Sequence, residues 1–172
     1  MRYLTVIRHA KAVPGAAGLS DFERSLAPRG QRQCRWLRER AADPAALGAF
    51  GPARVLVSSA RRTRETFAGA LEGTPFVLDT VLEPALYNGH HDVSTADVLA
   101  ALREADDGVS SLAVVGHNPT VYEFVVAVAT TTPAALAQGR YPLAGAIVLA
   151  LPNSGSLRGG PYDLVATFAH PD

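Results

Sequence analysis

Short runs of apolar residues, rich in β-branched side chains, recur along the chain and are bounded by turn-forming residues. Runs of this length and composition predict β-strands, because strands are short and β-branched side chains fit a pleated sheet. The five runs are Tyr3–Ile7, Arg54–Val57, Leu112–Val115, Ala146–Leu151 and Leu164–Phe168.

Between the first four runs, apolar residues recur every three or four positions, which is typical of helices with one buried face. The first of these stripes follows Pro28, a residue suited to the first turn of a helix. The third begins at Ser94, whose hydroxyl predicts an N-cap, with Asp97 in the first helical turn. The stripes are Cys34, Leu37 and Ala41; Phe67, Ala70 and Leu71; Val98, Leu102 and Ala105; and Val121, Phe124, Val125 and Val128.

The alternation of strands and helices predicts an α/β fold, a three-layer sandwich in which helices flank a mostly parallel, mixed sheet. The turn-rich stretch PNSGSLRGGP lies between the last two runs, so these two runs predict a terminal antiparallel hairpin. A length of 172 residues is ordinary for one domain, and we expect residues 1–172 to form a single domain.

The composition is that of a globular protein, with 48% hydrophobic and 19% charged residues. The 16 basic and 16 acidic residues cancel, so the overall charge does not indicate a nucleic-acid or membrane partner, and we expect neither. Cys34 is the only cysteine, which excludes an internal disulfide and fits a reducing compartment. We find no secretory signal and no apolar stretch near the roughly 20 residues of a membrane span, so we expect a cytoplasmic protein.

Basic side chains follow the first three predicted strands, at the point where each strand ends. Arg8 and His9 follow the first strand, Arg62 lies in SSARRTRET after the second, and His117 lies in GHNPT after the third. Because the carboxyl ends of parallel strands meet at one edge of a sheet, we expect these side chains to converge. Converging cations repel one another unless an anion occupies the site, and helix N-termini there add further donors. Phosphate fits this description better than sulfate or a carboxylate.

Each of these features also has a plainer interpretation. A histidine at a strand end can be a structural hydrogen-bonding group, and Arg61 can pair with Glu65 one helical turn later. In the same segment Ser58 or Ser59 can cap the helix, and Asn118 is the expected cap of the next one. The joint occurrence at three successive strand ends nevertheless favours an anion site.

The three motifs occur in an order and at spacings that resemble the histidine phosphatase superfamily, which has the phosphoglycerate-mutase-like fold. They are RHA after the first strand, SSARRTRET after the second and GHNP after the third. The short chain, the opening RHAK and the stretch DFERSL resemble the small phosphohistidine phosphatase branch, the SixA type. The resemblance extends from Met1 through the helix after His117 and is weakest after Thr130.

The resemblance implies roles for four residues. His9 matches the nucleophile, which attacks phosphorus to form a phosphohistidine that water then hydrolyses, while its other ring nitrogen donates to a backbone acceptor. Arg8 and Arg62 match the two arginines that clamp the phosphoryl group. His117 matches the second histidine, which we expect to be charged and to stabilise the phosphoryl oxygens. Such a cationic pocket can perform phosphoryl transfer by positioning and charge stabilisation, without a metal or other cofactor.

Two further residues match the family less directly. Arg24, in DFERSL, matches an arginine that binds substrate over the phosphate, although it could be an ordinary surface arginine. Glu83, in VLEPALYNG, lies near the place where larger members supply the general acid, and it could equally be a structural carboxylate before Pro84. Glu65 stands where the family usually has glutamine, and Ala10 where many members have glycine.

These residues predict a metal-independent phosphatase that acts on phosphohistidine in a protein or on a small phosphorylated molecule. Two alternatives remain open: a catalytically silent phosphate-binding module and a small phosphomutase. A nucleotide-binding module is a poorer interpretation, because the chain has no GxGxxG motif after the first strand and no P-loop lysine motif. His90, His91 and Asp92 resemble metal ligands, but the sequence suggests no further ligand from a distant segment, so we interpret them as a polar loop.

Overall fold

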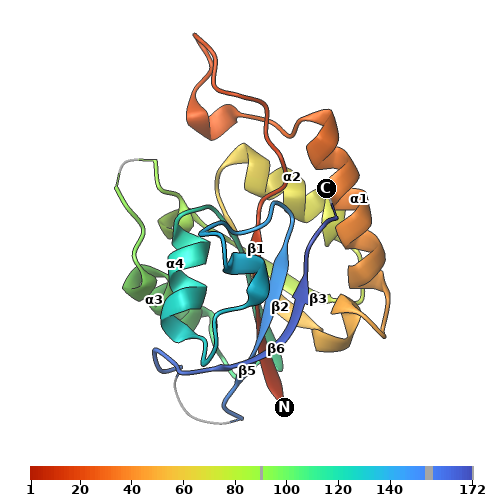
Figure 1. The fold of residues 1–172 in the computed structure, drawn as a ribbon, viewed down its shortest axis with the longest axis vertical. Helices are drawn as coiled ribbons and strands as arrows, with labels where there is room; N and C mark the ends of the chain where they lie inside the picture. Colours follow the sequence, from red (N-terminus) through yellow and green to blue (C-terminus); the bar gives the residue numbers. More distant parts are fainter. Residues whose placement is uncertain (90, 154–156, 172) are drawn as a thin grey trace.

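The computed structural model describes residues 1–89, 91–153 and 157–171. Its strands are β1 (Arg2–Arg8), β2 (Ala53–Ser58), β3 (Val77–Glu83), β4 (Ser111–Gly116), β5 (Ala146–Leu151) and β6 (Asp163–Phe168). Within the described residues these six strands form one sheet (Figure 1). The order of the strands in the sheet is β3-β2-β4-β1-β5-β6. The first four strands in that order are parallel, β5 is antiparallel to β1, and β6 is antiparallel to β5. The sheet is therefore mixed and mostly parallel, as predicted.

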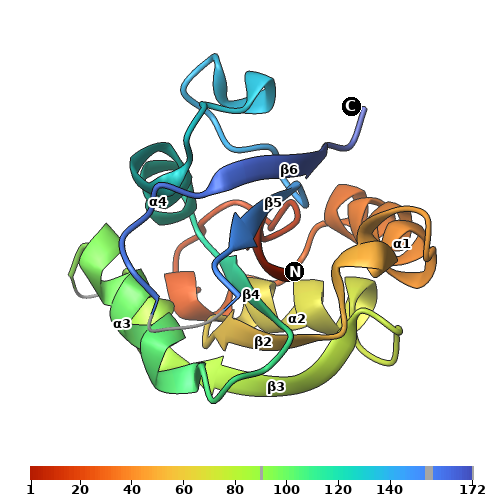
Figure 2. The same cartoon turned by 90° about the horizontal axis from the view of Figure 1, so that it is seen from below.

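Helices cover both faces of this sheet (Figure 2). They are α1 (Pro28–Ala42), α2 (Arg61–Ala70), α3 (Thr95–Ala105) and α4 (Thr120–Val128). α1 and α2 pack on one face, in a core that includes Leu37 and Phe76, and α3 and α4 pack on the other, with Leu102 and Phe124. This is the predicted three-layer sandwich. None of the helices in the described residues is long and apolar enough to cross a membrane.

Short 3₁₀ turns connect several of these elements. They are η1 (Asp21–Glu23), η2 (Leu47–Phe50), η3 (Pro84–Leu86) and η4 (Ala134–Leu136). η1 lies in the long segment between β1 and α1, and η3 follows β3 directly.

The five predicted strands are all present, with bounds that differ from the predicted ones by at most one residue at either end. β3 is the strand that the sequence pattern missed. Its apolar residues fall at positions 77, 78, 81 and 82, a spacing closer to that of a helix than to strand alternation. β3 lies at the edge of the sheet with Leu78 and Leu82 exposed, so no buried face imposes an alternating pattern on it.

Of the three helix caps predicted from the sequence, one is confirmed and two are wrong. Ser94 and Asp97 form the expected capping box at the start of α3. The expectation that Ser58 or Ser59 caps α2 is wrong, because the N-cap of α2 is Ala60 and makes no side-chain cap bond. Asn118 does not cap α4 either, since that helix begins one residue later than expected and its N-cap is Pro119.

The carboxyl ends of β1, β2 and β4 lie side by side at one edge of the sheet. Arg8 pairs in register with Gly116, which directly precedes His117. Ser58 ends β2 and pairs with Glu83 at the end of β3. The segment that contains η1 extends beyond this edge (Figure 1). Residues that follow the three strands are therefore brought together, as the sequence predicts.

Candidate active site

His9 leaves the end of β1 with its backbone and its ring both held. Its N–H donates to the carbonyl of Gly116 at 3.0 Å. Its Nδ1 lies 2.7 Å from the carbonyl oxygen of Ala10, and because a carbonyl only accepts, Nδ1 carries the proton. The expected contact between a ring nitrogen of His9 and a backbone acceptor is thus confirmed. Nε2, the other ring nitrogen, carries the lone pair. Burial, together with the charges of Arg62 and Arg8, lowers the pKa of His9 to about 3, so the ring is neutral.

His117 lies directly after β4 and is 2% exposed. Its Nε2 is 2.7 Å from the hydroxyl oxygen of Ser58, and its Nδ1 is buried with no partner in the described residues. The ring centroids of His117 and His9 are 5.3 Å apart. Burial, then the nearness of His9 and Arg62, lowers the pKa of His117 to about 2. Burial and the neighbouring cations thus favour the neutral ring in this structure, in contrast to the positive charge expected from the resemblance.

Arg8 and Arg62 bring two guanidinium groups to the same place. Arg8 donates from Nη1 to the carbonyl of Tyr141 at 2.6 Å, and its Nε is buried without a partner in the described residues. Burial lowers the pKa of Arg8 from its ordinary value. Arg62, in the first turn of α2, is 7% exposed and donates from Nη1 to the Asp21 carbonyl at 2.8 Å. Both arginines are thus fixed by backbone acceptors.

Arg24 lies immediately after η1 and joins this cluster. It donates from Nε to the carbonyl of Val13 at 2.8 Å and from Nη1 to the Asp21 carboxylate at 2.9 Å. Its charge contributes to lowering the pKa of His9, which places it near that ring. The structure therefore brings Arg24 together with Arg8 and Arg62, as the resemblance implies.

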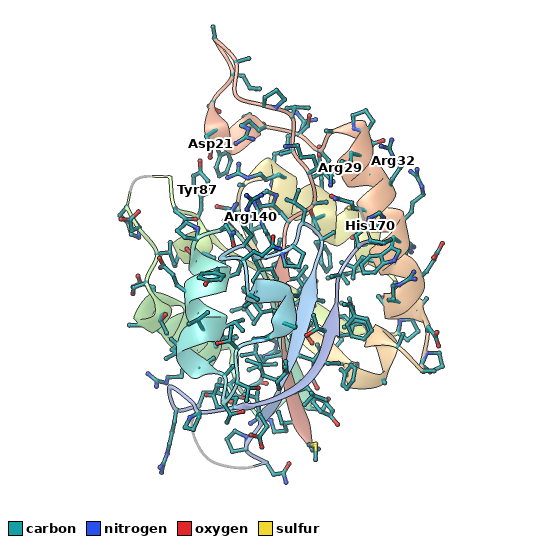
Figure 3. All side chains as sticks on the ribbon, in the orientation of Figure 1. Asp21, Arg29, Arg32, Tyr87, Arg140 and His170 are labelled. Carbon is teal, nitrogen blue, oxygen red and sulfur yellow. The ribbon has the colours of Figure 1, made fainter. Side chains whose placement is uncertain are left out.

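Asp21 and Tyr87 also belong to the site, and the sequence analysis missed them. The Asp21 carboxylate accepts from Nη2 of Arg62 at 3.1 Å and from the Tyr87 hydroxyl at 2.8 Å. The Tyr87 ring meets the His117 ring edge to face, with 5.7 Å between centroids. Figure 3 shows Asp21 and Tyr87 on facing segments at this edge of the sheet. Asp21 opens the DFERSL stretch, which was the one available signal, whereas nothing in the sequence marks Tyr87.

Glu83, the predicted general acid, ends β3 and caps the turn that follows it. Its carboxylate accepts from the N–H of Ala85 at 2.9 Å, the contact expected of a structural carboxylate before a turn. β2 and β4 lie between β3 and β1, so the Cα atoms of Glu83 and Arg8 are about 14 Å apart at the usual strand spacing. The described residues show no contact between Glu83 and either histidine.

Glu65, which stands where the resemblance leads us to expect glutamine, bonds to Arg61 and to the backbone of Leu26. One of its carboxylate oxygens accepts from Nε of Arg61 at 2.7 Å, and the other accepts from the N–H of Leu26 at 2.7 Å. Glu65 thereby ties α2 to the segment that carries Arg24. Its negative charge is already paired with Arg61, on the outer side of α2.

The remaining reactive side chains play no part in this cluster. Cys34 is 3% exposed, and burial raises the pKa of its thiol to about 11, so it is a core residue without thiolate character. Among residues 1–89, 91–153 and 157–171, no group of three or more His, Cys, Asp or Glu side chains is arranged to hold a metal ion. Of the possible ligands in the predicted polar loop, His90 lies outside the described residues.

The site thus combines three arginines from three different segments with the neutral imidazole of His9, whose Nε2 has no partner in the described residues. Guanidinium groups provide forked donors that match the oxygens of a phosphoryl group. In the described residues, the ion pairs of Arg24 and Arg62 are both with Asp21. The arrangement suits binding of an oxyanion and attack on it by His9.

Comparison with known proteins shows what the chain as a whole resembles. No family model matches the chain. An uncharacterized protein of Mycobacterium tuberculosis, Rv1276c of strain H37Rv, is 33% identical over 154 residues, which cover 83% of this chain and 85% of that protein. A protein of Agrobacterium tumefaciens assigned as the phosphohistidine phosphatase SixA is 26% identical, with a TM-score of 0.75 over 98% of this chain and 97% of its own. Another with the same assignment, from Nakamurella multipartitia, is 25% identical, with a TM-score of 0.73 over 99% and 97%.

The fold and the site together define a class of protein. The three strand-end motifs and the sheet order indicate the same class as the likeness to the two SixA structures. That likeness extends over nearly the whole chain. The chain belongs to the histidine phosphatase superfamily, in its SixA-like branch.

Proposed function

We propose that this protein is a metal-independent phosphatase that uses His9 as its nucleophile. One observation carries the proposal: the Nδ1–H of His9 is held by the carbonyl of Ala10, which leaves the lone pair on Nε2 beside three guanidinium groups. A nucleophile must be unprotonated to attack, and the lowered pKa of His9 meets that requirement at neutral pH.

The reaction proceeds in two displacements. Nε2 of His9 forms a bond to phosphorus while the bond from phosphorus to the leaving group breaks, and the electron pair leaves with that group. Water then attacks phosphorus, the N–P bond breaks, and its electron pair returns to Nε2. The water proton passes to solvent, and inorganic phosphate is released.

The other residues stabilise the charge on the transferring group. Arg8 and Arg62 hold its equatorial oxygens, and Arg24 closes over it from the η1 side. His117 contributes as a neutral ring, which donates one N–H to a phosphoryl oxygen or to Ser58. Cationic side chains thus supply the stabilisation that a metal ion supplies in other phosphatases.

The substrate class follows from the acids in the site. The Asp21 carboxylate is bound by arginines, and although desolvation raises its pKa, the bonds from Tyr87 and Arg24 outweigh this and lower it to about 2. Asp21 is therefore not a proton donor at neutral pH. Glu83 remains the candidate acid for oxygen leaving groups, and it would have to release the N–H of Ala85 to act.

A phosphohistidine substrate needs such an acid least, because a protonated imidazole is already a good leaving group. We therefore propose phosphohistidine in a partner protein as the substrate and a small phosphorylated molecule as the second choice. The single, buried Cys34 favours the cytoplasm as the location.

The proposal is tested with a chromogenic aryl phosphate in the presence of chelator, comparing wild type with His9→Ala. His170→Ala, beyond the end of β6, is the control for loss of a histidine. Turnover that survives chelation, disappears in His9→Ala and persists in His170→Ala supports the proposal. Phosphate binding without turnover in wild type would indicate a silent binding module, and turnover lost to chelator alone would refute the mechanism.

A further inference from the structure

Asp21 is the acceptor at the centre of the arginine cluster. Arg62 directs both terminal nitrogens at it, Nη1 to the carbonyl at 2.8 Å and Nη2 to Oδ2 at 3.1 Å. Arg24 donates to Oδ1 at 2.9 Å, and the Tyr87 hydroxyl donates to Oδ2 at 2.8 Å. A half-exposed carboxylate therefore uses the donors that a phosphoryl group would use.

The position of Asp21 relative to Arg62 indicates where it acts. The Arg62 side chain is 9% exposed, whereas the Asp21 side chain is 53% exposed. Asp21 thus lies on the solvent side of Arg62, the side from which an anion arrives. An anion that reaches the terminal nitrogens of Arg62 has to share them with Asp21 or displace it.

Tyr87 holds Asp21 in this position. The Tyr87 ring packs edge to face with Phe22, the neighbour of Asp21, with 5.2 Å between centroids. Its other contacts are the His117 ring and the guanidinium carbon of Arg62, which lies 6.0 Å from its centroid. The hydroxyl of Tyr87 therefore links η1 to the segment after η3, directly over the second histidine.

We propose that Asp21, held by Tyr87, is an internal competitor for Arg62 that weakens phosphate binding and so speeds product release. The inference rests on the proposed function, since it takes Arg62 as a phosphate ligand. When phosphate leaves, the Asp21 carboxylate returns to Nη2 of Arg62, so that nitrogen is never left without an acceptor. Asp21 and Tyr87 act through Arg62 and are positioning residues.

The charge state of Asp21 agrees with this role. Its pKa of about 2 keeps the carboxylate ionised at neutral pH, so the competitor is permanently present. A single negative charge competes well with monoanions and poorly with a phosphoryl dianion. Asp21 therefore makes the site selective for ligands that carry two charges.

The test measures kcat and KM for an aryl phosphate and the inhibition constant of inorganic phosphate. The variants are Asp21→Asn, Tyr87→Phe and the double variant, with Glu23→Gln as the matched control. Glu23 lies in the same turn and is exposed, and its charge acts on Arg61 instead of on the clamp. A thermal melt of each variant confirms that it is folded.

Asp21→Asn is expected to lower the phosphate inhibition constant by about three- to tenfold and to lower kcat, because release of phosphate becomes slower. Tyr87→Phe is expected to shift the constant in the same direction by a smaller factor, and the double variant to match Asp21→Asn. Glu23→Gln is expected to behave as wild type.

Weaker phosphate inhibition in Asp21→Asn would overturn the proposal, because Asp21 would then only orient Arg62. An unchanged constant, equal to that of Glu23→Gln, would overturn it as well. Both results leave the phosphatase function standing if wild type turns over substrate and His9→Ala does not. Wild type that neither binds phosphate nor turns over substrate would refute the proposed function and this inference together.

Discussion

Nε2 of His117 lies 2.7 Å from the hydroxyl oxygen of Ser58, and both residues are buried. The contact depends on the parallel pairing of β2 and β4, since Ser58 ends one strand and His117 follows the other. Thr63 donates to the carbonyl of Ser58 and so fixes the backbone at this point. Ser58 therefore orients the second histidine instead of capping α2.

Ser58→Ala is expected to lower kcat/KM by about tenfold, because it leaves a buried ring nitrogen without a partner and lets the His117 ring turn. Ser59→Ala, one position further, is the control, because the part of the chain that the structure describes shows no contact between its side chain and His117. The effect is measured with an aryl phosphate and should fall mainly on kcat. Equal activities in the two variants would show that His117 does not need Ser58 for its orientation.

The two buried histidines make stability depend on pH. Both have folded-state pKa values far below the ordinary 6.5, about 3 for His9 and about 2 for His117. Below pH 6.5 the unfolded chain therefore takes up protons that the folded chain does not, and stability falls as the pH falls towards these values. Asp21 does not contribute in this window, since it is ionised in both states until the pH approaches 3.8.

Each histidine should reduce the free energy of unfolding by about 1.4 kcal/mol per pH unit below its ordinary pKa. Urea denaturation at about pH 6 and about pH 5 gives the slope. His117→Asn removes one of the two groups and should reduce that slope by about half. A slope in His117→Asn as steep as in wild type would contradict the lowered pKa of His117.

The fold was largely predictable because most of its strands are buried on both faces and so consist of continuous apolar runs. β3 was not, because an edge strand needs no such pattern and its apolar residues at positions 77, 78, 81 and 82 imitate a helix. The cap expected at Ser58 is wrong because its hydroxyl contacts His117 instead. The cap expected at Asn118 is wrong because α4 begins only at Thr120, and Oδ1 of Asn118 is buried without a partner in the described residues.

The convergence of Arg8, His9, Arg62 and His117 was predictable because parallel strands place their ends at one edge. Asp21 and Tyr87 were not, because their contact joins segments 66 residues apart in the chain. The neutral state of His117 was missed for a similar reason, since its burial depends on packing that the sequence does not show.

Glu65→Gln tests the effect of a carboxylate at a position where the resemblance leads us to expect glutamine. Glu65→Gln keeps an acceptor for the N–H of Leu26 and loses only a half-exposed ion pair with Arg61, so stability should change by no more than about 0.5 kcal/mol. KM for an aryl phosphate should stay within about twofold, because Arg61 already pairs with that charge. A large fall in KM would show that Glu65 weakens phosphate binding. Glu65→Ala, which frees the segment bearing Arg24, should raise KM.

Glu83→Gln separates the two roles left to Glu83. The side-chain oxygen of glutamine can still accept from the N–H of Ala85, so the turn η3 and the stability should be preserved. Glutamine cannot donate a proton as a carboxylic acid does, so an acid role would appear as a loss that grows with the pKa of the leaving group. The measurement compares kcat/KM on phosphoimidazole, an aryl phosphate and an alkyl phosphate.

We expect Glu83→Gln to match wild type on phosphoimidazole, whose leaving group is already protonated, and to lose activity on the alkyl phosphate. An equal loss on all three substrates would refute the acid role, because leaving-group protonation cannot matter equally to them. Unchanged activity on the alkyl phosphate would leave Glu83 with the turn alone. The site would then lack an acid for oxygen leaving groups, and phosphohistidine would be the substrate that it can cleave without one.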